Sequence, residues 1–268
     1  MSDDFYRALE DKFRGSRELI KSRLQFYLPF VQPLLNFYPS AKAIDLGCGR
    51  GEWLEVLADN GFDAEGVDLD DDMLAACREC GLNVQTNDAL AFLRGMPDQS
   101  RVIVSGFHIA EHLPFEKLQA LVEEALRVLL PGGLLILETP NPENLVIGTS
   151  AFYLDPTHQR PLPPQLLAFL PEYAGFKLSK VVRLQESADL SGGGHLSLLD
   201  VLNGVSPDYA VVAQKDGSEE MLTAWQSVLG TEYGLTLETL AKRYQQQIEV
   251  KAQQAEAKAQ QAEAKAQQ

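Results

Sequence analysis

The strongest constraint on the fold is that short apolar segments alternate with helical patterns from residue 42 onward. Helical segments separate the first five apolar segments, and the longest is predicted over residues 115–130, before a Pro-Gly-Gly turn. Strands that alternate with helices indicate an α/β fold, with a mostly parallel sheet covered by helices on both faces. The seven predicted strands span residues 42–46, 63–69, 82–86, 101–107, 133–140, 176–184 and 208–214.

The chain is expected to divide into three parts around this sheet. Residues 1–40 carry apolar side chains at helical spacing and predict two helices that act as a cover, with a break before Ser16, the N-cap of the second. Residues 41–215 form the α/β domain, and residues 216–268 a helical extension. The segment 185–207, between the last two strands, is rich in Gly and Ser and predicts a long loop.

The C-terminal residues repeat a heptad, KAQQAEA, that begins at Lys251, Lys258 and Lys265. Its alanines follow the alternating three-and-four spacing of a coiled-coil seam, so we expect self-association through residues 237–268 as a dimer or trimer. A solvated single helix is the alternative, because alanine seams bury little area. The last repeat is incomplete, which predicts that the rod continues beyond Gln268.

Composition excludes several classes of protein. The formal net charge of −15 argues against nucleic acid or anionic lipid as a partner bound by charge alone. The charged first residues lack the apolar core of a secretion signal, and no run of about 18 apolar residues predicts a transmembrane helix. Three cysteines, an odd number, do not suggest a disulfide framework, and Cys77 and Cys80 are expected to be structural. These features predict a cytoplasmic protein.

A glycine-rich turn follows the first predicted strand in the segment AIDLGCGRGEW, residues 43–53. Such a strand, turn and helix N-terminus binds either a dinucleotide or S-adenosylmethionine (SAM), with an acid after the second strand, here Asp68, bonding ribose hydroxyls. The dinucleotide fingerprint fails because Glu52 stands where its third glycine should be. A carboxylate there would repel a pyrophosphate but not a ligand that carries a sulfonium and an amine. The turn therefore favours SAM.

The same segment resembles the first motif of the class I SAM-dependent methyltransferases, an acid two residues before G-x-G-x-G. Three further motifs of that family follow in order: GVDLD, NDALAFL and LLPGGLLILETPN. The resemblance covers residues 42–215. It implies a Rossmann-like fold of seven strands with an antiparallel last strand, SAM as the cofactor, and methyl transfer as the activity.

The resemblance also assigns cofactor-binding roles. Asp45 would orient the turn, Asp68 would bind ribose, and Asp88 would accept from the adenine amino group. The alternative role of Asp88 is the N-cap of the following helix. Arg17 would close over the SAM carboxylate, or else lie on a solvated helix face. The predicted cofactor-binding residues are Arg17, Asp45, Gly47, Gly49, Asp68, Leu69, Asp88, Ala89, Gly106 and Phe107.

The predicted catalytic residues are His108, Glu111 and His112 after the fourth strand, together with the distal His158. Three interpretations are open. One of the histidines is a general base that takes a hydroxyl proton during methyl transfer. Alternatively, the cluster resembles relatives that bind magnesium, with His158 or His195 completing the site. The third interpretation is a capping network that only positions the turn.

Residues 152–170 lie where this family inserts its acceptor-recognition segment. Tyr153, Asp155, His158 and Arg160 are the predicted substrate-binding residues. Aromatic faces and short polar groups suit a sugar ring, and Arg160 suits a phosphate or carboxylate. A proline-stiffened loop that packs on the core is the alternative. The glycine-rich residues 191–196, with His195, would form a mobile flap or a linker.

Three segments resemble methyltransferases of bacterial cell-surface polysaccharide synthesis: residues 11–30, 140–145 and 152–164. The resemblance implies an O-methyltransferase that caps an O-antigen glycan at a sugar hydroxyl or sugar phosphate. It also implies a glycosyltransferase as partner or fused domain, and a location at the inner face of the membrane through such partners. A small-molecule or RNA methyltransferase and a SAM-binding coiled-coil scaffold are the alternatives.

Overall fold

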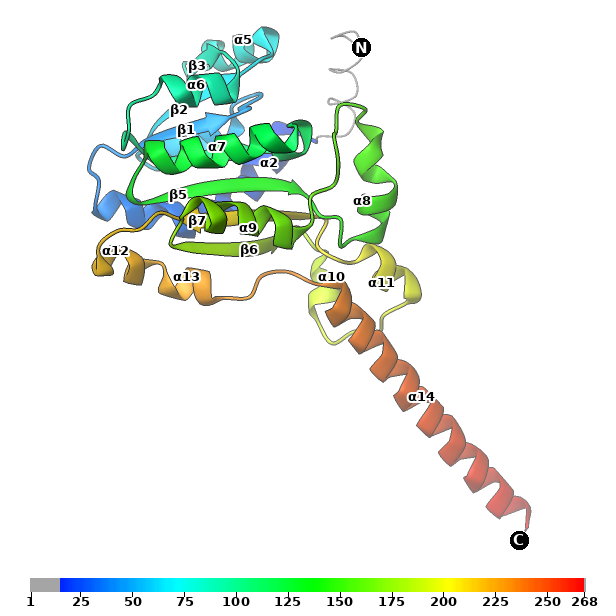
Figure 1. Ribbon diagram of the computed structural model, residues 1–268. Helices are drawn as coiled ribbons and strands as arrows, with labels where there is room; N and C mark the ends of the chain where they lie inside the picture. The colour runs from blue at the N-terminus through cyan, green and yellow to red at the C-terminus, as the bar shows by residue number, and fades with distance from the viewer. Residues whose placement is uncertain (1–14, 268) are drawn as a thin grey trace.

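A computed structural model describes residues 15–267, and the first predicted N-terminal helix lies outside this range. One seven-stranded sheet forms the centre of the molecule, in the order β3-β2-β1-β4-β5-β7-β6 (Figure 1). β7 runs antiparallel to both neighbours and the other neighbouring pairs are parallel, which confirms the predicted topology. The strands are β1 Lys42–Leu46, β2 Asp63–Asp68, β3 Asn83–Thr86, β4 Arg101–Phe107, β5 Leu129–Pro140, β6 Leu178–Leu184 and β7 Asp208–Gln214.

Helices cover both faces of the sheet, as the alternating pattern predicts. Along β5, Leu135 and Leu137 pack with α6, α7 and α9 on one face. Leu134 and Ile136 pack with α4 and the N-terminal segments on the other, because successive side chains of a strand point to opposite faces. The α-helices are α2 Arg17–Leu24, α3 Leu28–Val31, α4 Glu52–Asp59, α5 Asp71–Glu79, α6 Ala89–Gly95, α7 Phe115–Val128, α8 Leu145–Thr149, α9 Pro164–Ala174, α10 Ala188–Ser191, α11 Leu198–Asn203, α12 Glu219–Ala224, α13 Gln226–Gly230 and α14 Leu237–Ala266.

The described N-terminal residues belong to the core and are more than a cover. Ser16 caps α2 by accepting from the amide of Leu19, as predicted. Short 3-10 helices at Gln25–Tyr27 and Gln32–Asn36 flank α3, and this region buries Tyr27, Phe30 and Leu34. Trp225, in the predicted extension, is also fully buried, and its indole N–H donates to the carbonyl of Phe30. The packed domain therefore continues beyond the predicted boundary at residue 215.

The segment 185–207 is not the long loop that its Gly and Ser content predicts, because it contains α10 and α11. Ser197 and Asp200 form a capping box at the start of α11, which offsets the weak helix propensity of the region. The glycine-rich loop between the two helices lies against α14, where Arg243 donates to the carbonyls of Leu190 and Gly192. In this structure that loop is held in place rather than free.

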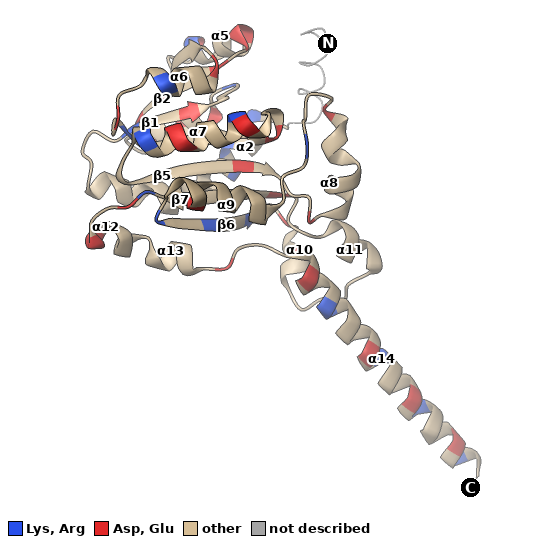
Figure 2. Ribbon diagram, in the orientation of Figure 1, with Lys and Arg blue, Asp and Glu red and all other residues tan. Residues whose placement is uncertain are grey.

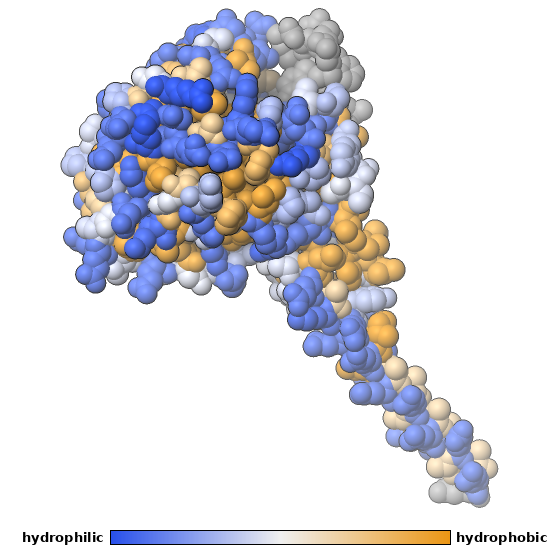
Figure 3. Space-filling view, in the orientation of Figure 1, coloured by the Kyte–Doolittle hydropathy of each residue, from blue (hydrophilic) through white to orange (hydrophobic). Residues whose placement is uncertain are grey.

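Helix α14 projects away from the domain, and Leu240 is the one residue of the helix that is buried (Figure 1). Acidic and basic residues alternate along it (Figure 2), and the heptad alanines are exposed. Exposed apolar side chains lie on the nearby α11, where Leu198 and Leu199 contribute to an apolar surface (Figure 3). Self-association through α14 stays a prediction. Within residues 15–267, none of the helices combines the length and apolar character needed to span a bilayer.

Candidate functional site

A cavity of about 1,060 Å³ lies at the edge of the sheet where the parallel strands end. Its walls come from the turns after β1, β2 and β4, from α2, and from the segment around residues 151–158. The predicted site residues that line it are Asp45, Gly47, Gly49, Asp68, Leu69, Asp88, Ala89, Phe107, His108, His112, Asp155 and His158. The topology thus brings together residues that are more than 100 positions apart in the sequence.

The glycine-rich turn has a backbone that only glycine adopts readily. Gly47, Gly49 and Gly51 all have positive φ angles, of 66°, 51° and 76°. A Cβ atom on Gly51 would also lie 2.6 Å from Cδ1 of Leu82, too close for packing without movement. These glycines let the chain turn sharply from β1 into α4 and pass along the cavity wall.

Asp68 holds the turn, and Asp45, just before it, bonds the neighbouring strand β4. The Asp68 carboxylate accepts hydrogen bonds from the amides of Gly49, at 2.8 Å, and Asp70, at 2.9 Å. Buried Asp45 accepts from the hydroxyl of Ser105 at 2.7 Å. A carboxylate has about four acceptor positions, so Asp68 can bond the turn and still accept from ribose hydroxyls. The predicted ribose role of Asp68 is compatible with this geometry.

Asp88 takes up the alternative role considered for it. It is the N-cap of α6, and its Oδ1 accepts from the amide of Ala91 at 2.9 Å. The residue also lines the cavity, as does Leu69, which is 72% exposed. An apolar side chain and a carboxylate at the same wall suit a flat nitrogen-containing ring, so capping and adenine recognition are compatible at Asp88.

Two predicted cofactor-binding residues, Arg17 and Gly106, do not line the cavity. Arg17 donates to the carbonyl of Arg50 at 2.6 Å and forms an ion pair with Glu55 at 2.9 Å, so its guanidinium is directed to α4. Gly106 is buried inside β4. The cation on the cavity wall is instead Arg23, two helical turns further along the same segment. The amphipathic pattern predicts the helix, but not which arginine faces the cavity.

His108 is surrounded by carboxylates. Its Nδ1 lies 3.1 Å from Glu111, and its Nε2 lies 3.4 Å from Glu138 and 4.0 Å from Asp208. Although desolvation opposes the charged form, the hydrogen bonds to Glu111 and Glu138 raise the pKa of His108 well above its ordinary value. A protonated ring with both nitrogens engaged cannot accept another proton, so His108 does not fit the predicted role of general base.

The backbone at His108 is also unusual. Its φ of 55° lies in the left-handed region, as does that of Gln185, at 67°. Among the described residues Gln99 is the third non-glycine residue with positive φ, and it is the only one of the three that does not line the cavity. Strained backbone that clusters at a cavity is typical of functional sites.

Sequence reasoning missed Glu138, Asp208 and Tyr27. The hydroxyl of buried Tyr27 donates to Glu138, while burial, together with Glu138, raises the pKa of Asp208 to about 6. Glu138 follows the central part of β5 at the ligand-binding edge, which is a signal that could have identified it. Asp208 begins β7, and an antiparallel strand begins at the edge where its parallel neighbours end, so only the topology identifies it.

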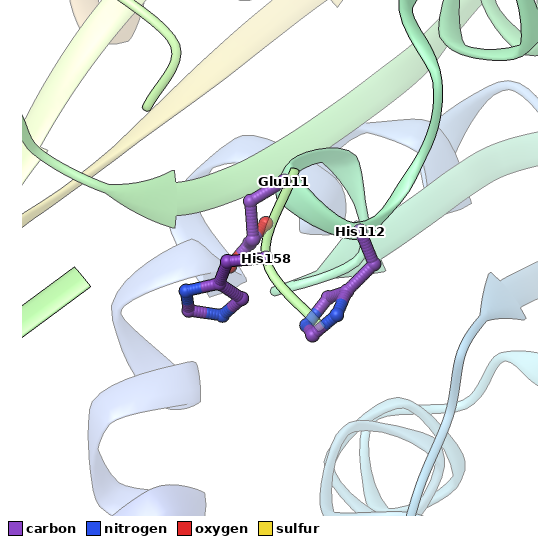
Figure 4. Close-up of side chains that lie close together, drawn as sticks. All are labelled: Glu111, His112 and His158. Atoms are coloured by element: carbon purple, nitrogen blue, oxygen red, sulfur yellow. The ribbon is translucent and has the colours of Figure 1, made fainter. Parts of the chain in front are cut away.

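Glu111, His112 and His158 lie close together (Figure 4), with one potential ligand atom from each within 4.8 Å of the others. Glu111 is 1% exposed and does not line the cavity, and its two oxygens already bond His108 and, at 3.0 Å, the hydroxyl of Thr139. Magnesium prefers oxygen ligands and keeps several waters, whereas this group offers two imidazoles and one engaged carboxylate. The residues therefore do not fit magnesium.

The other predicted partner of a metal, His195, lies apart from this group, beside Lys251 of α14. His112 contacts Thr157, with 2.8 Å between Nδ1 and the hydroxyl oxygen, and its ring packs edge-on against that of His158. His158 Nδ1 lies 2.6 Å from the carbonyl of Phe152. Both imidazoles are thus anchored through Nδ1 on the cavity wall.

Two predicted substrate-binding residues lie outside the cavity. Tyr153 is 61% exposed, and the guanidinium of Arg160 stacks on the ring of Phe115, 4.5 Å from its centroid. Neither side chain lines the wall, whereas Asp155 and His158 do. The segment reaches the site with alternate parts of its chain, because a 3-10 helix at Ala151–Leu154 turns Tyr153 outward.

The cavity wall is strongly acidic. Among the described residues Arg23 is the only Lys or Arg that lines it. The carboxylates that line it are Asp45, Glu52, Asp68, Asp70, Asp71, Asp72, Asp88, Glu138, Asp155 and Asp208. Such a wall attracts cations and disfavours anions.

Comparisons with known proteins agree with this geometry. A family model described as a methyltransferase domain matches residues 43–133. A SAM-dependent methyltransferase from Archaeoglobus fulgidus superimposes with a TM-score of 0.70 and 33% identity, over 79% of this chain and 100% of that one.

Two curated proteins are also similar. A probable S-adenosylmethionine-dependent methyltransferase of Mycolicibacterium smegmatis is 29% identical over 72% of this chain and 73% of its own length. A ubiquinone biosynthesis O-methyltransferase of Methylococcus capsulatus is 36% identical over 37% of this chain and 44% of its own length. The second match therefore covers less than half of either protein.

Proposed function

The chain belongs to the class I SAM-dependent methyltransferases, and from this premise we propose that it methylates a hydroxyl group on an uncharged acceptor. The observation that carries the proposal is the acidic cavity wall with two anchored imidazoles, His112 and His158. We call the part of the cavity that these histidines line with Glu138, Asp155 and Asp208 the acceptor end. SAM is the cofactor, and when bound it supplies a methyl group made electrophilic by the positive sulfonium.

The residues that line the cavity fit this cofactor. Asp68 offers acceptors for ribose hydroxyls, and Leu69 and Asp88 form a wall that suits adenine. Asp45 lies on the wall near the turn, where a carboxylate favours the positive charges of a sulfonium and an ammonium group. Glu52 also lines the wall, but its carboxylate is paired with Arg50 at 2.8 Å. Arg23 is available for the one carboxylate of SAM, the role expected of Arg17.

Charge at the acceptor end distinguishes between the two acceptor groups considered from the sequence, a sugar hydroxyl and a sugar phosphate. Glu138, Asp155 and Asp208 line this end, and the imidazolium of His108 is already paired with carboxylates. A sugar phosphate would enter this site against like charges that lie close together. A neutral polyol would find acceptors for its hydroxyls at Glu138 and Asp208. This favours a sugar hydroxyl over a sugar phosphate.

An uncharged hydroxyl has to lose its proton during transfer, so the site needs a base. The two imidazoles, His112 and His158, are the groups suited to this task, because they line the cavity and histidine exchanges protons near neutral pH. Most of the rate enhancement would come from holding the hydroxyl in line with the methyl group. Glu138 and Asp208 would orient the neighbouring hydroxyls of the acceptor.

A hydroxyl of a bacterial surface glycan is the first acceptor to test. The purified protein is incubated with an envelope extract and SAM that carries a tritiated methyl group, and label is counted in polysaccharide, lipid, RNA and small-molecule pools. Label in the polysaccharide supports a glycan acceptor. Label confined to RNA, or to an anionic product, would contradict an uncharged acceptor.

A phenolic hydroxyl is the second candidate acceptor. Several curated relatives are named ubiquinone biosynthesis O-methyltransferases, although each match covers less than half of this chain. A phenol is also an uncharged hydroxyl and fits the same acidic site. Label confined to the small-molecule pool would favour this candidate and leave the proposed chemistry intact.

Self-association through α14 belongs to the same proposal. Its heptad alanines and Ile248 are exposed, and little of the helix packs on its own domain. A dimer or trimer would cover this seam and would present several methyltransferase domains, or a glycosyltransferase partner, at the cytoplasmic face of the membrane. Light scattering of the purified chain tests it, and a monomeric mass at micromolar concentration would contradict it.

A further inference from the structure

Three side chains at the acceptor end form a continuous hydrogen-bonded chain that ends on the cavity wall. The hydroxyl of Thr157 lies 2.6 Å from Oδ1 of Asp155 and 2.8 Å from Nδ1 of His112. Resting on the proposed hydroxyl methylation, we infer that Asp155 and Thr157 are positioning residues that hold the His112 proton on Nδ1 and leave Nε2 to take the acceptor's proton.

Which group donates in each of these hydrogen bonds follows from counting the protons on Thr157. Its hydroxyl has one proton, and two neighbours, a carboxylate oxygen and an imidazole nitrogen, could receive it. If the proton pointed to His112, two oxygens without a proton between them would face each other at 2.6 Å, which is repulsive. The hydroxyl therefore donates to Asp155, and His112 Nδ1–H donates to the hydroxyl.

Asp155 is available for this role because it is ionised. The hydroxyl and the amide of Thr157 both donate to Oδ1 of Asp155, the amide at 2.7 Å. Although burial works in the opposite direction, these bonds lower the pKa of Asp155 below its ordinary value. A carboxylate that is fully charged at neutral pH accepts protons in hydrogen bonds and donates none.

The charges around His112 are compatible with a neutral ring at rest. Burial lowers the pKa of His112, Glu111 and Asp155 oppose that shift, and His158 and His108 add to it, with a net shift downward. A base has to be unprotonated before the reaction, and this balance keeps it so at neutral pH. Once His112 gains a proton, Asp155 stabilises the positive ring through Thr157.

The proposed methyl transfer conserves atoms, electrons and charge. A lone pair of the acceptor oxygen forms the new O–CH₃ bond as the S–CH₃ bond of SAM breaks, and its electron pair stays on sulfur, which becomes neutral. The hydroxyl proton passes to Nε2 of His112. The imidazolium later releases this proton to water. The net products are a methyl ether, S-adenosylhomocysteine and one proton.

His158 lacks this arrangement. Its Nδ1 contacts a carbonyl oxygen, which can only accept, so its Nδ1 also carries a proton. The hydrogen bonds from His158 therefore end at this neutral carbonyl group. Those from His112 continue through Thr157 to a carboxylate. Nε2 of His158 lies 3.9 Å from Oδ2 of Asp155. The geometry thus assigns proton transfer to His112 and makes His158 a neighbour that packs against it.

Imidazole nitrogen NMR tests the assignment without any acceptor. With only four histidines in this 268-residue chain, the protein labelled with ¹⁵N-histidine gives few signals, and His112→Gln identifies those of His112. We expect a protonated Nδ1 and an unprotonated Nε2 in the wild-type protein at neutral pH. In Thr157→Val, which keeps the side-chain shape, the proton should move wholly or partly to Nε2.

Matched variants separate positioning from folding. Thr157→Ser restores the hydroxyl and should restore the wild-type spectrum. Thr223→Val removes a threonine hydroxyl that bonds its own helix, α12, and does not line the cavity, and should change nothing. A wild-type His112 protonated on Nε2, or a Thr157→Val spectrum identical to that of the wild type, would overturn the inference.

Kinetics complete the test once an acceptor is known. Thr157→Val should lower kcat by about 10- to 100-fold while the Kd for SAM stays within about twofold, and Thr157→Ser should recover most of the rate. An equal loss in both variants would indicate a structural role and contradict positioning. If the NMR result holds but no uncharged hydroxyl is methylated, the proposed function fails and the arrangement of His112 stands.

Discussion

The two ends of the cavity are built in different ways. The cofactor end is made mostly by backbone: a glycine-rich turn with positive φ angles, held by Asp68. The acceptor end is made by side chains that come from β4, β5, β7 and the segment after α8. Most residues of the first end lie between residues 45 and 89, at the ends of three consecutive strands, whereas those of the second are spread from residue 108 to residue 208. Each end should therefore fail separately when its own residues are changed.

The largest expected effect breaks the acceptor end alone. Replacement of His112 by Gln removes the proposed proton acceptor, and we expect kcat to fall by about 10²- to 10⁴-fold, the usual range for a lost general base. The Kd for SAM, measured by calorimetry, should stay within about twofold. His158→Gln is the matched control and should cost less than His112→Gln. The reverse order would assign the base to His158.

The converse experiment breaks the cofactor end. Asp68→Asn keeps the shape of the side chain but removes the charge that accepts from Gly49 and from ribose. A hydrogen bond to a charged group contributes about 1.5–3 kcal/mol, so the affinity for SAM should fall by about 10- to 100-fold. The kcat at saturating SAM should change little. A large loss of kcat with unchanged affinity would mean that the two ends are not independent.

The pH dependence of kcat/KM sharpens the comparison. The base works only when His112 is neutral, so activity should be lost as the pH falls through the pKa of His112. Because burial lowers this pKa, the loss should lie below about pH 6.5, with about tenfold less activity per further pH unit. His108 should contribute no such loss, since its pKa is raised. A midpoint well above pH 6.5 would contradict the assignment.

A small effect is expected where sequence and structure disagree. Arg160 was a candidate for phosphate binding, but it stacks on Phe115 outside the cavity. Arg160→Ala should therefore change kcat/KM by no more than about twofold. Arg23→Gln, on the cavity wall, is the matched comparison and should weaken SAM binding more. A tenfold loss in Arg160→Ala would show that the acceptor extends beyond the cavity.

The smallest expected effect concerns metal. Because Glu111 is engaged and its neighbours His112 and His158 are imidazoles, this group does not suit magnesium. In the second group of potential ligands, His108 lies between Glu138 and Asp208, and Tyr27 also donates to Glu138. We therefore expect EDTA to leave the rate unchanged and added magnesium not to raise it. A rate that disappears with EDTA and returns with a divalent ion would contradict this. It would also replace the proton-acceptor role of His112.

The fold was largely predictable because its signals are local. The strand positions follow from apolar runs between helical patterns, and the glycine turn at residues 47–51 carries its own φ requirement. Asp68 and Asp88 could be identified because they lie within motifs at the ends of strands. The misjudged loop at 185–207 shows the limit, since α11 depends on a capping box and on packing against α14, which a composition of Gly and Ser does not reveal.

The acceptor end was predictable only in part. His112 and His158 were identified as residues, but their roles depend on Nδ1 contacts with Thr157 and Phe152 that no spacing predicts. Asp208 belongs to the site because β7 is antiparallel, and Arg23 replaces Arg17 because of how α2 is rotated on α4. Such features require the tertiary structure.

The most direct measurement is the chemical identity of the bond that receives the methyl group. The protein is incubated with an envelope extract and SAM that carries a ¹³C-methyl group, and the product is examined by NMR. A methyl carbon without coupling to phosphorus, in a neutral product, is the result expected for transfer to an uncharged hydroxyl. A methyl signal split by phosphorus would show transfer to a phosphate and would contradict it.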